Sequence, residues 1–272
     1  MKRMLTILVV VLLLGLSNYG LAQETEETPT TITIGLKMWY ASWEETFTVG
    51  TYEETQESDY GLMYGPVLNI RSGNLFLGLS YLMGSFTFED SWTDSGYYGY
   101  YGGDYYYWYD DIEWKSEADR TDVDLSIGYY FHPNLALFLG YKTSNFEFRE
   151  TWTVTETISN YYTDTYEYEF EDTREMELSG PALGLTGHFP IGESRWILFG
   201  TLSYISLASK FEGEAGPDFT GPAYEFGAAY IAETMPVSVT VGYKYQKYEA
   251  EEEGVTLEEI FSGLTVGVNY TF

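Results

Sequence analysis

Apolar and polar residues alternate in short segments along the chain. Between Val123 and Phe131, the odd-numbered positions carry large apolar or aromatic side chains and the even-numbered positions carry mostly small or polar ones. Successive side chains of a strand point to opposite faces, so this pattern predicts strands with one apolar face. It recurs in ten segments: Thr31–Trp43, Leu62–Arg71, Leu75–Phe88, Arg120–Phe131, Leu135–Phe148, Glu177–Phe189, Trp196–Ala208, Pro222–Ile231, Val237–Tyr248 and Ile260–Phe272.

The connections between these segments alternate in length. Ser72–Asn74, His132–Asn134, Pro190–Arg195 and Glu233–Pro236 are tight turns, and the other five connections are longer and polar. An even strand number with short turns on one side and long loops on the other predicts an all-β fold, a ten-stranded antiparallel up-and-down transmembrane β-barrel. The long loops would be extracellular and the short turns periplasmic. A soluble β-sandwich would not need this alternation of turn lengths.

The first residues of the chain predict export. Lys2 and Arg3 precede the apolar run Leu5–Leu16, and the small residues that end at Ala22 suit a signal peptidase. We therefore expect a signal peptide over 1–22 and a single barrel domain over 23–272. Past Ala22 no apolar run approaches the roughly 20 residues of a membrane helix. The chain has no cysteine, so its stability cannot depend on disulfides.

The ending GLTVGVNYTF alternates to a terminal aromatic residue, Phe272. In this respect the chain resembles the integral outer-membrane β-barrels of Gram-negative bacteria. The resemblance implies contact with outer-membrane lipid and lipopolysaccharide, and it implies that the barrel-assembly machinery reads the C-terminal strand. Omptin proteases and Opc-type adhesins share the strand number, and nothing closer assigns a family.

The polar face of the predicted strands carries charges of both signs. A ten-stranded barrel is little wider than its own side chains can fill, so these charges are expected to pair with one another and fill the lumen. The alternative is a narrow, porin-like solute channel that these residues line. The predicted lumen network comprises Lys37, Arg71, Asp122, Asp124, Lys142, Glu225 and Lys244.

The remaining acidity lies mostly in the predicted loops. The formal net charge is −29, and the carboxylates crowd Glu44–Asp59, Asp104–Asp119 and Glu156–Glu175. Such loops repel nucleic acid, so no nucleic-acid partner is expected. The simplest interpretation is a solvated surface. Binding of divalent cations is the alternative, although no calcium-loop spacing is present.

Two of the loops are expected to be ordered. The third loop keeps alternating on both sides of Ser159-Asn160, which predicts a hairpin that continues its strands beyond the membrane. The second loop has a similar base, in which we expect Phe86 and Phe88 to face Ile112 and Trp114.

The tip of the second loop reads SGYYGYYGGDYYYWYDD, from Ser95 to Asp111. Its glycines are expected to interrupt any strand. Tyrosine with glycine and aspartate is also the composition of antibody binding loops, which favours a protein or glycan ligand. A low-complexity loop without a ligand is the alternative. The candidate ligand-binding residues are Tyr97, Tyr98, Tyr100, Tyr101, Tyr105, Tyr106, Tyr107, Trp108 and Tyr109.

Catalysis is not expected. Both histidines, His132 and His188, fall at the predicted periplasmic side, so an extracellular esterase site would lack its base. Omptin proteases use acidic pairs with an Asp/His pair at the outer rim. Asp122 and Asp124 could imitate a carboxylate pair, but the chain has no Asp-x-His.

No cofactor or metal is expected either, because the sequence has no glycine-rich phosphate loop, no CxxC and no HExxH. The sequence thus favours a surface barrel for adhesion or recognition. The alternatives are a narrow solute channel and a structural barrel without a ligand.

Overall fold

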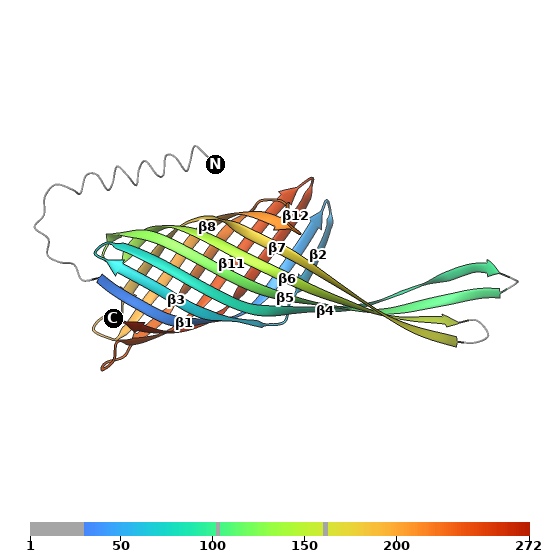
Figure 1. Ribbon diagram of the computed structural model, residues 1–272, viewed down its shortest axis with the longest axis horizontal. Helices are drawn as coiled ribbons and strands as arrows, with labels where there is room; N and C mark the ends of the chain where they lie inside the picture. The colour runs from blue at the N-terminus through green and yellow to red at the C-terminus, as the bar shows by residue number, and fades with distance from the viewer. Residues whose placement is uncertain (1–29, 102–103, 160–162) are drawn as a thin grey trace, which may run out of the picture. The chain divides into compact units, whose positions relative to one another are not determined.

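The computed structural model describes residues 30–101, 104–159 and 163–272. Within these ranges the chain is built of strands and short turns (Figure 1). No helix in the described residues is long and apolar enough to cross a membrane. The predicted signal peptide lies outside the described residues.

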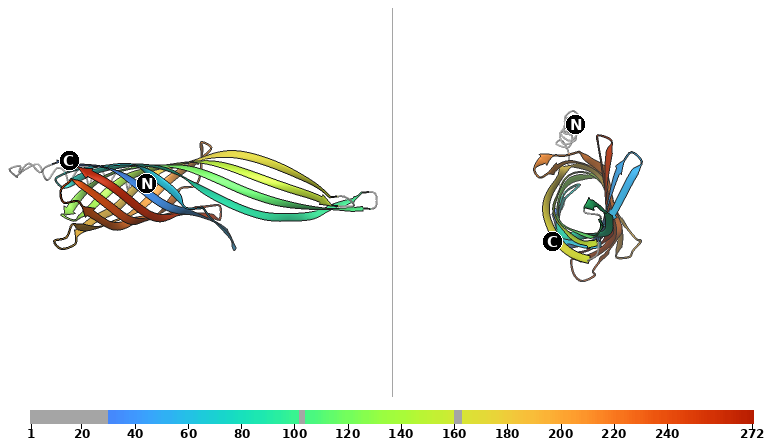
Figure 2. Two further views of the ribbon diagram at one scale, coloured as in Figure 1. Left: turned by 90° about the horizontal axis from the view of Figure 1, so that it is seen from below. Right: turned by 90° about the vertical axis from the view of Figure 1, so that its right-hand side faces the viewer.

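Ten strands form a closed ring. Each pairs antiparallel with its chain neighbours, and β12 closes the ring on β1, as the view along the axis shows (Figure 2). The ring contains β1 (Thr30–Val49), β3 (Gly61–Ser72), β4 (Leu75–Tyr101), β5 (Asp104–His132), β6 (Leu135–Ser159), β7 (Thr163–Pro190), β8 (Trp196–Phe211), β10 (Phe219–Ile231), β11 (Val237–Glu252) and β12 (Val255–Thr271). The short strands β2 (Tyr52–Glu57) and β9 (Glu214–Ala215) extend the tips of β1 and β8.

The predicted fold class and the ten predicted segments are confirmed, but one predicted loop is wrong. The connection between β11 and β12 was expected to be long, whereas the two strands pair as far as Glu252 and Val255. Glu253 and Gly254 alone make the turn, with φ of 52° and 84°. Both residues have positive φ, as in the two-residue turns that fit the twist of a hairpin. The polar sequence there belongs to strands that leave the membrane.

The outer wall carries a belt of exposed apolar side chains. Leu36 is 65% exposed, and Ile127, Val241 and Leu264 are each more than half exposed. Aromatic residues border the belt on both sides. Phe131, Phe189, Trp196, Tyr230, Tyr270 and Phe272 lie at the short-turn end, and Tyr40, Tyr60, Tyr64, Tyr81, Tyr141 and Tyr204 lie toward the other end. A continuous apolar belt with aromatic borders is the surface that a barrel presents to lipid.

Beyond the aromatic border that lies farther from the short turns, the apolar side of the barrel wall changes from outside to inside. On β6, Leu137 and Tyr141 point outward and are exposed, but Phe146 is buried inside and its neighbour Glu147 is exposed. The pairing of β6 with β7 runs through this region without a bulge. Along β6, the apolar residues therefore occupy odd-numbered positions within the belt and even-numbered positions beyond it. The barrel here has the polar exterior and apolar interior of a water-soluble protein.

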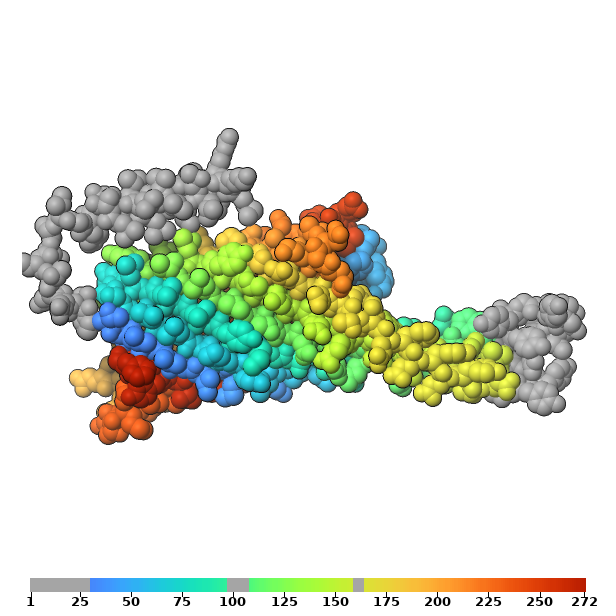
Figure 3. Space-filling model, in the orientation of Figure 1, coloured from blue at the N-terminus to red at the C-terminus, as the bar shows by residue number. Residues whose placement is uncertain are grey.

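Strands β4 to β7 run past the ring as a four-stranded extension (Figures 1 and 3). We call this the distal sheet and define it as residues 90–101, 104–114, 151–159 and 163–171. The hairpin predicted for the third loop is confirmed. The expected base of the second hairpin is wrong, because Phe86 pairs with Ala118, Phe88 with Ser116, and Ile112 with Trp92.

The expectation that glycines interrupt the second hairpin is wrong at Gly96, because β4 continues through this residue, which pairs with Trp108. Around Gly99 the register shifts, between Tyr98 and Tyr101, and Gly102 and Gly103 lie outside the described residues. A glycine between paired strands loses little of the ladder, because its backbone groups still bond to their partners.

Candidate functional site

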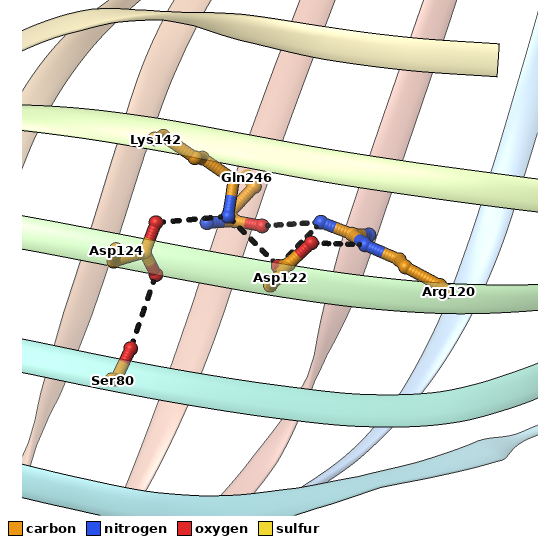
Figure 4. Close-up of polar contacts among 6 residues, drawn as sticks. All are labelled: Ser80, Arg120, Asp122, Asp124, Lys142 and Gln246. Carbon is orange, nitrogen blue, oxygen red and sulfur yellow. Dashed lines mark hydrogen bonds and ion pairs between the residues drawn. The ribbon is translucent and has the colours of Figure 1, made fainter.

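The barrel interior holds an ion-pair cluster around Asp122 (Figure 4). Its two oxygens accept hydrogen bonds from Arg120 Nε and Nη2 and from Lys142 Nζ, each at 2.8 Å. Lys142 also contacts Asp124 Oδ1 at 3.1 Å, and Arg120 Nη2 donates to Gln246 Oε1 at 3.2 Å. Arg120 and Asp122 are fully buried side chains. Burying these charges is tolerated because each has partners of the opposite sign.

A second pair lies across the lumen. Lys37 Nζ is 2.6 Å from Glu225 Oε2, and Thr265 Oγ1 donates to the other oxygen of Glu225 at 3.1 Å. Five of the seven predicted lumen residues therefore lie in these two groups of ion pairs.

The other two differ from the expectation. Arg71 lies over the ring of Tyr130 at 4.1 Å, and its Nε donates to the backbone oxygen of Gly73. Lys244 lies over Trp39, 4.3 Å from the ring centroid, and no carboxylate oxygen of the described residues lies within 4.0 Å of its nitrogen. Arg71 sits at the short-turn end, where Tyr130 and the turn backbone are its nearest partners. Aromatic faces thus take the place of carboxylates.

Arg120 is a member of the lumen cluster that was not among the predicted residues, although its even-numbered position indicates the lumen face. It shares the even-numbered face of its strand with Asp122 and Asp124, which were assigned to the lumen. The predicted strand begins at this residue, and the predicted lumen network did not include it.

An apolar cluster closes the interior above these charges. Trp43 is its centre and is fully buried, with Phe88 and Phe261 at ring distances of 5.0 Å and Phe146 at 5.2 Å. Two cavities lie on opposite sides of the cluster. One, of about 270 Å³, is lined by Lys37, Asp124, Glu225 and their neighbours. The other, of about 230 Å³, is lined by Glu45, Glu150, Arg174, Glu259 and apolar residues of the cluster.

The distal sheet is amphipathic. The even-numbered residues of its strands, which continue the face that lines the barrel interior, are largely aromatic or aliphatic. Trp92, Ile112, Val154 and Tyr168 are successive cross-strand partners in one row, and Trp114, Trp152 and Phe170 are partners in the next. We call this the aromatic face. Trp92, Tyr166, Tyr168 and Phe170 are between 44% and 57% exposed.

The opposite face of the distal sheet is polar. Thr151, Thr153 and Thr155 of β6 are paired with Glu171, Glu169 and Glu167 of β7, and Asp111 and Glu113 lie on the same face of β5. Tyr109 donates to Asp111, and this hydrogen bond raises the pKa of the phenol. Segments 90–114 and 151–171 together hold eleven Asp and Glu and no Lys or Arg. The sheet is therefore strongly electronegative.

The tyrosine-rich segment continues the second hairpin. The backbone of Tyr97 pairs with Tyr107, and that of Tyr98 with Tyr106. Trp108 is partly buried and Tyr109 is 45% exposed. The side chains of 97–107 lie outside the described part of the chain. Ligand binding by these residues stays a prediction.

The residues weighed for catalysis lie apart from the distal sheet. Asp122 is held by Arg120 and Lys142, and Lys142 also bridges it to Asp124. His132 ends β5 beside a short turn, and His188 lies opposite Tyr130 at the same end of the barrel, with ring centroids 5.7 Å apart. The barrel interior thus separates the histidines from the distal sheet.

The structure is similar to solved outer-membrane barrels. The outer membrane protease OmpT from Escherichia coli matches with a TM-score of 0.52 at 14% identity, over 92% of this chain and 99% of that chain. OprG from Pseudomonas aeruginosa matches at 0.34 and 11%, over 90% and 97%, and Ail of Yersinia pestis at 0.25 and 10%, over 89% and 99%. The TM-scores of these two matches are too low to support a conclusion about this chain. No protein-family model matches the chain, and no curated protein matches it.

The likeness to OmpT concerns the fold alone. Together with the lipid-facing belt, it identifies the fold as that of a bacterial outer-membrane β-barrel and places the chain in the outer membrane. In this fold the short turns face the periplasm and the long hairpins face outward.

Proposed function

We propose that this chain is a surface recognition protein that binds a partner through the distal sheet. The observation that carries the proposal is the outer part of the aromatic face, beyond the membrane, where Trp92, Tyr168 and Phe170 are 44–57% exposed. At the base of this face, Trp114 is partly buried against the apolar cluster of the interior. Leaving large aromatic side chains exposed to water is unfavourable, and exposed apolar patches of this kind mark binding surfaces. The barrel anchors the sheet.

The chemistry of the sheet suggests the class of partner. Exposed Trp, Tyr and Phe side chains act as anchors in protein interfaces, and flat aromatic faces also suit sugar rings. The excess of carboxylates favours a partner with basic groups and disfavours nucleic acid. We therefore expect a protein or a glycan-bearing surface with a positive patch.

The interior supports binding rather than conduction. A solute moving through the barrel would have to pass between Trp43 and its aromatic neighbours and then through the ion pairs of Asp122. Displacing such packed groups costs several kcal/mol. We assign Asp122 and Asp124 to the stability of the barrel, not to a reaction.

The test compares two triple variants displayed on cells. The first changes Trp92, Tyr168 and Phe170 to Ser and removes the centre of the aromatic face. The control changes Phe47, Tyr52 and Phe211 to Ser, which are exposed aromatic residues of other hairpins. Attachment is measured across a glycan array and a panel of matrix proteins.

We expect the first variant to lose about 100-fold in affinity, since each aromatic anchor is worth about 1–2 kcal/mol. The control should bind like the parent. If the first variant binds as well as the parent, or if the parent binds nothing in the panel, the proposal is wrong.

The tyrosine tip is a second arm of the same proposal. Changing Tyr105, Tyr106, Tyr107, Trp108 and Tyr109 to Ser alters only the end of one hairpin. We expect weaker attachment with unchanged heat-modifiable migration on gels, because a loop tip adds little to the ladder of a barrel. Unchanged attachment would remove these residues from the site.

A further inference from the structure

One edge of the distal sheet is open. The pairing of β7 with β8 ends at Met176 and Phe211, and the backbone oxygen of Glu175 still accepts a hydrogen bond from Glu212. Beyond that point β7 has a partner only on its β6 side, within the described residues. A strand with one partner offers a row of backbone donors and acceptors to another chain.

The direction of these backbone groups follows from the last bond to β8. In an antiparallel sheet the N–H and C=O of one residue point to the same side, and successive residues alternate. Glu175 points toward β8, so the other odd-numbered residues of the strand point to the open side. Glu167, Glu169 and Glu171 therefore present their backbone groups to the open edge.

The opposite edge of the sheet, on β4, is protected. Two of its backbone N–H groups, those of Ser91 and Ser95, are taken by the carboxylates of Asp90 and Asp94, at 2.7 and 2.8 Å. On the β7 edge one N–H group is taken in the same way, that of Thr173 by Asp172 Oδ1 at 2.9 Å. The described residues show no such bond at Glu167, Glu169 or Glu171, so this part of the β7 edge remains available.

Both faces of the β7 edge have a regular chemistry. Glu167, Glu169 and Glu171 are exposed on the polar face, opposite neutral threonines of β6, and form no ion pair in the described residues. Tyr166, Tyr168 and Phe170 are exposed on the aromatic face. A strand added here would place alternate side chains beside carboxylates and beside aromatic rings.

We propose that the open edge of β7 binds an extended segment in which basic and apolar residues alternate, as an added antiparallel strand. Its basic residues would lie opposite the three glutamates and its apolar residues opposite the aromatic side chains. A second copy of this chain is disfavoured, because equal rows of carboxylates repel each other. The inference rests on the proposed function and names the partner of the same sheet.

The backbone geometry allows a sharp test. The basic residues would form the hydrogen-bonded pairs with the glutamates, so their N–H groups would point at β7, and those of the apolar residues would point away. The probe is a short peptide of alternating lysine and valine. One version is N-methylated on the lysines, and the other is N-methylated on the valines. Binding to the refolded full chain is measured by fluorescence anisotropy.

We expect the unmodified peptide and the valine-methylated peptide to bind alike and the lysine-methylated peptide to lose binding by about tenfold or more. A peptide of the same composition with its lysines grouped together should also bind weakly. Equal binding by the two methylated peptides, or stronger binding by the lysine-methylated peptide, overturns the proposal.

Matched variants of the chain test the position. Changing Glu167, Glu169 and Glu171 to Gln should weaken binding of the alternating peptide by about tenfold. The control variant combines Asp111→Asn, Glu113→Gln and Glu147→Gln. It removes the same number of charges as the β7 variant, from the polar face of the central strands β5 and β6. This control should change binding of the peptide by less than about threefold. Equal losses would mean non-specific attraction and would overturn the edge site.

The two proposals can fail separately. If the aromatic-face variant loses attachment but the alternating peptide does not bind, recognition by the sheet stands and the added strand is wrong. If the peptide binds as described while the aromatic-face variant attaches like the parent, the edge site stands and the proposed function is wrong.

Discussion

At the scale of residues, Asp122 is the carboxylate that neutralises the buried cations Arg120 and Lys142 of the interior. Arg120 and Lys142 both direct hydrogen bonds to it, and all three side chains are buried. Asp124 is different, because its side chain is 36% exposed and it meets Lys142 alone among the cations of the cluster. Removing one partner of a buried pair leaves an unpaired charge in a poorly solvated place.

We expect Asp122→Ala to lower the free energy of unfolding by about 3–5 kcal/mol, because Arg120 would stay buried without a counter-charge and Lys142 would keep only the partly exposed Asp124. Asp124→Ala should cost less. The measurement is urea unfolding in lipid vesicles, followed by tryptophan fluorescence.

The control is Asp119→Ala, which removes a partner of Arg149 from a pair at 2.7 Å with both side chains about half exposed. It should cost less than about 1 kcal/mol. If Asp119→Ala destabilises the barrel as much as Asp122→Ala, burial is not the cause.

At the scale of elements, the strands were predictable and the cluster inside them was not. The segment Val123–Phe131 gave its strand from alternation alone, because the lipid-facing side needs large apolar residues at every second position. The same rule fails farther from the membrane, at Phe146. There the apolar residues of the strand occupy even-numbered positions, whereas within the membrane they occupy odd-numbered positions. Phe146 and Trp43 occupy positions on the lumen face. The rule that apolar residues face lipid gives no reason for these positions to be apolar. Alternation that reverses phase within one strand is the signal that would have found the cluster.

The distal sheet was predicted only in part for a related reason. Thr153 and Glu169 occupy one face and Val154 and Tyr168 the other, so the hairpins were visible in the sequence. The joining of the two hairpins into one sheet depends on the pairing of β5 with β6, whose partners lie up to 52 residues apart, as for Tyr107 and Ser159. Pairings between hairpins leave no local pattern.

We expect Trp43→Ala to lower the free energy of unfolding by about 3–5 kcal/mol, since it opens a cavity in a packed cluster. Trp92→Ala, on the aromatic face of the distal sheet, should stay within about 0.5 kcal/mol of the parent because Trp92 is 45% exposed. Urea unfolding of both variants checks this. Equal losses would place Trp43 outside a packed interior.

At the scale of the whole molecule, the chain combines two surface types on one closed ring. Within the belt the outside is apolar, and beyond the belt the outside is polar and the inside apolar. This order fixes the depth of the barrel in the bilayer. Sliding it toward the periplasm would bring Glu147 into lipid, and sliding it outward would expose the apolar belt to water. The distal sheet is thereby held away from the membrane on the outer side.

The orientation can be tested by labelling, because the chain contains no cysteine. Thr93→Cys lies on the distal sheet and Glu193→Cys in the short turn before β8. We expect a membrane-impermeant maleimide to label Thr93→Cys on intact cells and Glu193→Cys only after the outer membrane is opened. Labelling of Glu193→Cys on intact cells would reverse the orientation.

The most direct test of recognition by the distal sheet is to remove the sheet and keep the barrel. Residues 91–113 and 151–171 are each replaced by Asn-Gly, which closes a two-residue hairpin on the pairs Asp90–Trp114 and Glu150–Asp172. The quantity measured is attachment of expressing cells to the surface that the parent binds, with heat-modifiable migration as the check on folding. We expect the shortened barrel to migrate like a folded barrel and attachment to fall to that of cells without the protein. Attachment equal to the parent's by a folded, shortened barrel would contradict the account.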